Sequence, residues 1–102
     1  MVETLENWAS GDWVVKEGNE EPFVERWKSW LEWSSQNIPG FVSATLIRDL
    51  QDPRHFVSFS AWQDAASRDA WKNSDGFGER FPTVRELCEQ FQGGDFVRVA
   101  GF

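Results

Sequence analysis

Residues 41–62 read FVSATLIRDLQDPRHFVSFSAW, and this stretch predicts two strands joined by a tight turn. The first strand, residues 41–49, is rich in β-branched side chains, and an Asp-Pro pair marks the turn. Side chains alternate between two faces along a strand. One face of the second strand, residues 55–62, therefore carries Phe56, Ser58, Ser60 and Trp62. We expect a β-hairpin at the middle of the chain.

A helix is expected before this hairpin, over residues 22–37. Its apolar side chains recur at spacings of three, four and seven, and so share one face with Ile38 just beyond: Phe23, Trp27, Trp30 and Leu31. Pro39 and Gly40 end the helix. Residues 12–17 predict a short strand before it, and residues 1–11 are expected to form a loose arm.

Two helices and one strand are expected after the hairpin. Asp64 is placed to cap a helix over residues 65–73. A further helix is expected to reach Gln92, because four apolar residues in its later part fall at helical spacing: Val84, Leu87, Cys88 and Phe91. Gly93 and Gly94 would end it, and residues 95–100 alternate as a last strand.

The resulting order, β-α-β-β-α(α)-β, is typical of a ferredoxin-like α+β fold with helices on one face of an antiparallel sheet. A chain of 102 residues forms a single domain, which we place at residues 12–102. Helices on one side leave the other sheet face uncovered, and a second copy commonly buries such a face. We therefore expect a two-fold symmetric homodimer.

The charge balance excludes several classes of partner. Ten Lys and Arg against seventeen Asp and Glu give a net charge of −7, which argues against nucleic acid and against an anionic membrane surface. No apolar run is long enough to span a membrane, and the first ten residues do not resemble a secretory signal. One cysteine and one histidine predict neither a disulfide framework nor a metal site. The cytoplasm is the expected location.

The chain has few residues for catalysis by a side chain. It contains no glycine-rich phosphate loop, no nucleophile elbow and no tyrosine. His55, at the end of the hairpin turn, is either a base or an exposed turn residue. Cys88 lies on the apolar stripe of the expected last helix, where a buried thiol is inert.

Aromatic residues are the most informative feature, since nine Phe and seven Trp occur among 102 residues. Two interpretations stay open: a core rich in tryptophan, or a flat apolar pocket for an aromatic small molecule between helices and sheet. The residues expected in such a pocket are Phe23, Trp27, Trp30, Trp62, Trp71, Phe77 and Phe81. Ser58 would supply a hydroxyl, and Arg85 a cation at the rim.

Several segments together resemble the antibiotic biosynthesis monooxygenase domains of the dimeric α/β-barrel superfamily. They are FVERW at 23–27, PGF at 39–41, RD at 48–49 through DP at 52–53, FVSF at 56–59 up to Trp62, and WKNSDGF at 71–77. One branch of this family oxidises polycyclic phenols to quinones with no metal or flavin, and another degrades haem. Many members have no established activity.

The resemblance implies roles for particular residues. Trp62 matches a tryptophan that shapes the pocket in both branches, and Ser58 stands where the quinone-forming branch has an asparagine that assists oxygen chemistry. Phe81 stands near the position of the axial histidine of the haem-degrading branch. We therefore expect a monooxygenase that needs no cofactor and acts on a polycyclic aromatic phenol, with Trp62 and Ser58 as its catalytic residues. The alternatives are a non-catalytic binder and, ranked last, a haem enzyme.

Overall fold

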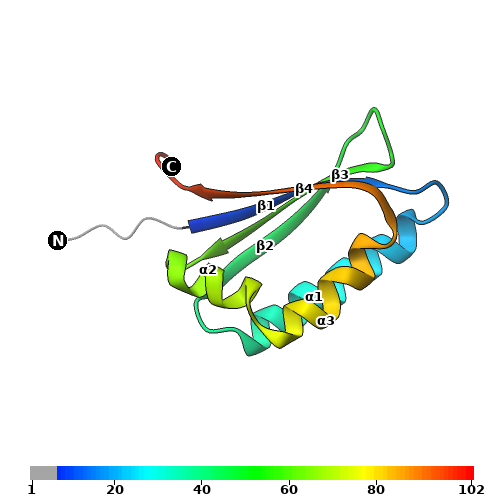
Figure 1. Cartoon of the computed structure of the whole chain (residues 1–102). Helices are drawn as coiled ribbons and strands as arrows, with labels where there is room; N and C mark the ends of the chain where they lie inside the picture. The colour runs from blue at the N-terminus through cyan, green and yellow to red at the C-terminus, as the bar shows by residue number, and fades with distance from the viewer. Residues whose placement is uncertain (1–6) are drawn as a thin grey trace.

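Four strands form one antiparallel sheet in the order β2-β3-β1-β4 (Figure 1). The computed structural model describes residues 7–102. The strands are β1 (Asn7–Val15), β2 (Phe41–Arg48), β3 (His55–Trp62) and β4 (Cys88–Val97). This arrangement is the ferredoxin-like α+β fold predicted from the order of elements.

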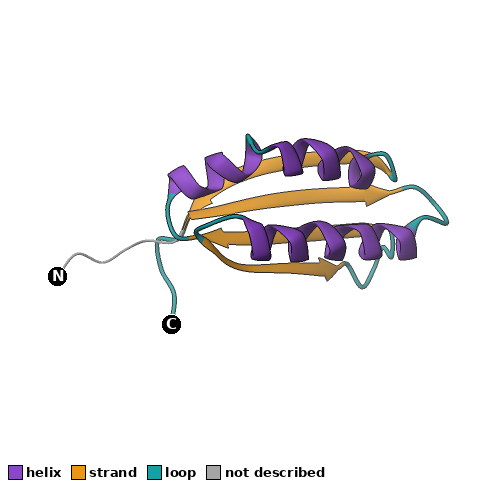
Figure 2. Ribbon diagram, turned by 90° about the horizontal axis from the view of Figure 1, so that it is seen from below, coloured by secondary structure: helices purple, strands orange, loops and turns teal. Residues whose placement is uncertain are grey.

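Three helices cover one face of the sheet (Figure 2). They are α1 (Glu20–Asn37), α2 (Ala65–Lys72) and α3 (Asp75–Arg85). The predicted apolar stripe of α1 is confirmed, because Phe23, Trp27, Trp30 and Leu31 are all buried. The predicted cap of α2 is also confirmed: the Asp64 carboxylate accepts a hydrogen bond of 2.7 Å from the Ser67 amide. Hydrogen bonding from Ser67, first through its side chain and then through its amide, lowers the pKa of Asp64.

The start of the sheet differs from the sequence prediction. β1 begins at Asn7, so residues 7–11 are not a loose arm but the first half of a central strand between β3 and β4. Gly11 pairs with Ser58 on one side and with Gly93 on the other. The part of the expected arm at residues 1–6 lies outside the described residues.

The last helix and strand also differ from the prediction. α3 ends at Arg85, and residues 88–92 belong to β4 rather than to a helix. The register of β4 against β1 shifts so that Val15 pairs with Cys88 while Val14 pairs with Gln90. This bulge inserts an extra residue, which puts Cys88 and Phe91 on the same face although they are three apart. Inward-facing residues of this bulged strand are therefore three apart in sequence, which is also the spacing along one face of a helix.

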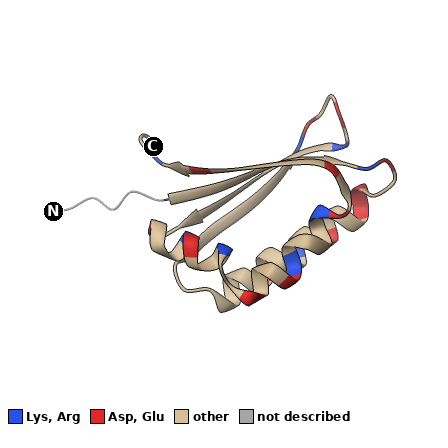
Figure 3. Cartoon of the chain, viewed as in Figure 1, with Lys and Arg blue, Asp and Glu red and all other residues tan. Residues whose placement is uncertain are grey.

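The two faces of the sheet have different surroundings. The inner face and the helices enclose the aromatic core, which includes Trp13, Phe56 and Trp62 at no more than 2% exposure. Charged positions gather on helices and loops, and most of the strand surface is uncharged (Figure 3). The outer face exposes large apolar side chains, among them Ile47, Phe59 and Phe96. No helix in residues 7–102 is long and apolar enough to cross a membrane.

Candidate ligand-binding site

A cavity of about 200 Å³ lies between the helices and the inner face of the sheet. Its floor exists because the sheet carries small residues at neighbouring positions on three strands. These are Ala9 and Gly11 on β1, Ser58 and Ser60 on β3, and Gly93 on β4. Since larger side chains at these positions would fill the space, the register of the three strands creates the cavity.

Aromatic side chains form the walls of the cavity: Trp13, Trp30, Trp71, Phe77, Phe81 and Phe91. Their rings pack on one another in both stacked and edge-on arrangements. Trp30 stacks on Trp71 with ring centroids 5.4 Å apart and 17° between their planes, and Phe77 stacks on Phe81 at 5.2 Å and 13°. Such walls suit a flat apolar ligand.

Serine hydroxyls accept hydrogen bonds from the indoles of the core. Trp13 donates to Ser58 Oγ at 3.0 Å, and Trp62 donates to Ser60 Oγ at 2.9 Å. Neither of these two hydroxyls donates a hydrogen bond to any described residue, so each keeps its own proton for an acceptor in the cavity. The cavity floor therefore offers two hydroxyl donors.

The third tryptophan–serine pair lies between α1 and α2. Trp71 donates to Ser34 Oγ at 2.9 Å, and this hydroxyl in turn donates to the Trp30 carbonyl at 2.8 Å. The indole nitrogen of Trp30 itself is buried and has no hydrogen-bond partner among the described residues.

One charged side chain lines the cavity. Lys72 is the last residue of α2, and its ammonium group forms an ion pair with Asp95 on β4. Asp95 lies opposite Ala9 in the sheet, so it is at the edge of the cavity floor. Arg68 also approaches Asp95, at 3.7 Å. The rim between α2 and β4 is therefore bridged by ion pairs.

The structure brings together five of the residues expected from the sequence: Trp30, Ser58, Trp71, Phe77 and Phe81. Trp62 is fully buried behind the wall, where it packs on Trp71 with centroids 4.8 Å apart. Phe23 is fully buried against Trp13 and Phe56, and Trp27 lines a separate groove beside β2. Trp62 and Phe23 therefore pack behind wall residues of the cavity, and Trp27 does not line it.

Arg85 is not at the rim of this cavity, contrary to expectation. Its guanidinium donates to the Cys88 carbonyl at 3.0 Å, and it lines a polar surface hollow with Asp12 and Glu89. Sequence reasoning instead missed Lys72, Trp13 and Phe91. The alternation along residues 12–17 allows Trp13 to be placed on the inner face, whereas the helical spacing of residues 84–91 predicts a helix at Phe91.

His55 and Cys88 lie outside the cavity. His55 is not a free turn residue, because Asp49 bonds its Nδ1 and Asp12 its Nε2, each at 3.0 Å. The hydrogen bond to Asp49 is the main cause that raises the pKa of His55 above its ordinary 6.5. Burial raises the pKa of the Cys88 thiol to about 11, as expected for an inert thiol.

These residues do not suit a metal or haem site. Among residues 7–102, no three His, Cys, Asp or Glu side chains are grouped so that they could hold a metal ion. The single histidine is engaged by two carboxylates, and Phe81 contributes a hydrocarbon ring to the cavity wall. Neither side chain is placed as an iron ligand in the cavity.

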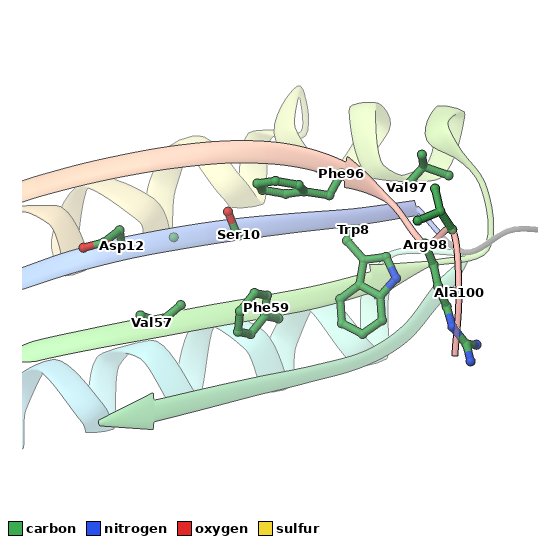
Figure 4. Close-up of a pocket in the computed structure, with 11 residues that line it drawn as sticks. Trp8, Ser10, Asp12, Val57, Phe59, Phe96, Val97, Arg98 and Ala100 are labelled. Carbon is green, nitrogen blue, oxygen red and sulfur yellow. The ribbon is translucent and has the colours of Figure 1, made fainter. Parts of the chain in front are cut away.

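A second, wider hollow of about 440 Å³ lies on the outer face of the sheet (Figure 4). Figure 4 shows Trp8, Ser10 and Asp12 of β1 beside Val57 and Phe59 of β3, with the chain after β4 turning across one end. Trp8 meets Phe59 edge-on with ring centroids 6.3 Å apart. This hollow lies on the face that no helix covers, whereas the smaller cavity lies under the helices.

The fold and the cavity define a ferredoxin-like domain with an aromatic-walled, apolar site. The family model for antibiotic biosynthesis monooxygenases matches residues 5–81, which is more than half of the chain. The chain belongs to the antibiotic biosynthesis monooxygenase family. Its sequence matches no curated protein.

Solved structures show the same fold at low sequence identity. A mutant of SnoaB, a cofactor-independent oxygenase from Streptomyces nogalater, is 21% identical with a TM-score of 0.87, covering 94% of this chain and 95% of its own. A conserved protein from Methanosarcina mazei is 22% identical with a TM-score of 0.81, covering 91% and 92%. A protein from Shewanella oneidensis is 19% identical with a TM-score of 0.80, covering 96% and 95%.

Proposed function

We propose that this protein is a monooxygenase that oxidises a small aromatic phenol without a cofactor. The aromatic-walled cavity over a floor with hydroxyl donors is the observation that carries this proposal. Membership of the family and the shared fold with SnoaB, described as a cofactor-independent oxygenase, support it. The substrate itself supplies the electrons for oxygen in such a reaction.

The residues of the cavity have distinct parts in this reaction. Trp30, Trp71 and the Phe77–Phe81 stack hold the ring system, and the Ser58 and Ser60 hydroxyls donate to the anionic oxygen of the substrate. The phenol loses two hydrogens, one from the ring carbon that is oxidised and one from its hydroxyl group; one atom of O₂ forms the new carbonyl and the other leaves as water. The apolar walls exclude solvent from the reacting anion. Trp62 positions Trp71 and Ser60 rather than touching the substrate.

The size of the cavity restricts the substrate. Pockets for drug-sized ligands hold about 300–1,000 Å³, and this cavity holds about 200 Å³. A molecule of one or two fused rings therefore fits better than a larger polycycle. We expect naphthols and hydroquinones to be better substrates than anthrones.

Oxygen uptake with naphthols, hydroquinones and anthrones, in buffer with a chelator, tests the proposal. We expect uptake above the rate without enzyme, unaffected by the chelator. Ala9→Leu fills the cavity from its floor and should abolish uptake, while Ala44→Leu on the same sheet face, outside the cavity, should retain it. Equal uptake by wild type and Ala9→Leu would place the reaction elsewhere.

The second candidate is a non-catalytic binder of the same kind of molecule. Among the described residues that line the cavity, Lys72 is the single titratable one, and no carboxylate or histidine is placed there as a general base. A binder would show calorimetric binding of naphthols that Ala9→Leu abolishes, with no oxygen uptake for any of them.

We also propose that the protein is a homodimer in the cytoplasm. The exposed apolar side chains of the outer sheet face support an interface with a second copy. A lone reduced cysteine is compatible with a reducing compartment.

A further inference from the structure

We infer that Lys72 recognises an anionic oxygen of the ligand and that Asp95 is the counter-ion which the ligand displaces. This inference rests on the proposed small-molecule site. It narrows the ligand class to aromatic molecules that carry a carboxylate or phenolate group.

The charge of the residues that line the cavity is opposite in sign to the net charge of the protein. The chain has a net charge of −7, yet the one charged side chain among the lining residues is a cation. The Ser58 and Ser60 hydroxyls at the floor accept hydrogen bonds from indole N–H groups and keep their own O–H groups as donors. A site with a cation and free donors matches an oxygen anion better than a neutral or cationic group.

Lys72 can release Asp95 without leaving that carboxylate unpaired. The Lys72–Asp95 pair is partly exposed, with side-chain exposures of 34% and 46%. Arg68 lies 3.7 Å from the same Asp95 carboxylate and is the more buried cation, at 13% exposure. When the Lys72 ammonium moves to a ligand, Arg68 therefore still neutralises Asp95. An exposed ion pair of this kind is worth little, so its exchange costs little.

The position of the pair places the anion at the edge of the cavity. Gly93 and Ala9 line the floor, and Asp95 pairs with Ala9 in the sheet. Lys72 is one residue beyond Trp71, whose ring forms the wall. A flat ring among the aromatic walls would thus have its charged substituent at the rim, within reach of the lysine and of solvent.

Calorimetric titration with 2-naphthoate and with neutral 2-naphthamide tests this inference. Wild type should prefer naphthoate. Lys72→Met should weaken naphthoate binding about three- to tenfold and leave naphthamide binding unchanged, because a partly exposed charge contributes modestly. Lys72→Arg should keep the preference. Asp95→Asn removes the competing acceptor and should strengthen naphthoate binding about two- to threefold.

Lys28→Met is the matched control, since Lys28 is also a helix lysine in a surface ion pair, with Glu25 at 3.6 Å, but does not line this cavity. It changes the net charge equally and should leave both affinities unchanged. Loss of both ligands in Lys72→Met, or weaker naphthoate binding in Asp95→Asn, would show a merely structural ion pair and overturn the inference. If neither ligand binds to wild type, both the site and the inference are wrong; if both bind with a ratio insensitive to Lys72, only the inference is wrong.

Discussion

At the level of single residues, buried tryptophans need hydrogen-bond acceptors for their indole N–H groups, and serine hydroxyls provide them. An indole N–H inside the protein needs an acceptor, and three of the four tryptophans exposed by 5% or less have a serine oxygen within 3.0 Å. The alternation of β3 predicted that Ser58, Ser60 and Trp62 share a face. It could not predict that Ser58 accepts a hydrogen bond from Trp13, because Trp13 comes from β1.

Ser34 gives a prediction for these pairs. Ser34→Ala leaves the Trp71 N–H buried without an acceptor and should lower the free energy of unfolding by about 1–3 kcal/mol. Ser35→Ala, on the next residue, removes an exposed hydroxyl and should change stability by less than about 0.5 kcal/mol. Urea unfolding monitored by circular dichroism measures both. Equal effects of the two changes would mean that the Trp71–Ser34 bond contributes nothing.

The ion pairs of His55 should make the stability of the fold depend on pH. Its pKa is raised, chiefly by the hydrogen bond to Asp49, so its contribution to stability is complete below 6.5 and is lost as pH rises through the folded-state pKa. The pKa of Asp49 is lowered by the same bond, so its contribution is present above 3.8 and is lost as pH falls through its folded-state pKa. The stability difference between wild type and His55→Gln should therefore be largest between about pH 4 and 6.5. Unfolding series from pH 4 to 9 test this, and a difference that grows above pH 7 would contradict it.

At the scale of elements, the sequence was informative where one periodicity dominated. Phe23, Trp27, Trp30 and Leu31 predicted α1, and the alternation of β3 predicted its inward face, because local pattern and burial agree there. The sequence of residues 88–92 fits a helix as well as a strand. The bulge next to Val14 leaves the inward-facing residues Cys88 and Phe91 three apart, which is also a helical spacing. A bulge depends on the partner strand, so local sequence does not reveal it.

Replacing either of two glycines of α3 by alanine should change the stability of the protein, but in opposite directions. A Cβ on Gly76 would overlap the ring of Trp33 on α1, whereas a Cβ on Gly78 would meet nothing within 4 Å. Gly76→Ala should therefore push α3 away from α1 and destabilise the protein by about 1–3 kcal/mol. Gly78→Ala should stabilise it by about 0.5–1 kcal/mol, through the higher helix propensity of alanine. Thermal and urea unfolding test the pair, and a stabilising Gly76→Ala would show that Trp33 moves aside freely.

At the scale of the molecule, half of the candidate site was predictable. The aromatic wall from the helices, Trp30, Trp71, Phe77 and Phe81, follows from composition and helical spacing. The floor does not, because it needs Ala9, Gly11 and Gly93 to be in register on neighbouring strands. Glycines in a sequence normally indicate turns, and only the assembled sheet shows that Gly11 and Gly93 line the floor of a cavity.

The outer sheet face supports the last prediction, which concerns assembly. Phe59 and Phe96 are 37% and 57% exposed on either side of Trp8, and burial against a second copy would remove this apolar area from water. Wild type should sediment as a dimer, while the double change Phe59→Asp and Phe96→Asp should give a monomer, because it would place charges in the interface. Leu50→Asp, at a 99% exposed turn position, should leave the dimer intact. Circular dichroism should show that all three proteins keep the fold. Wild type that sediments as a monomer at every concentration would contradict the proposed dimer, and the outer face would then be open to solvent.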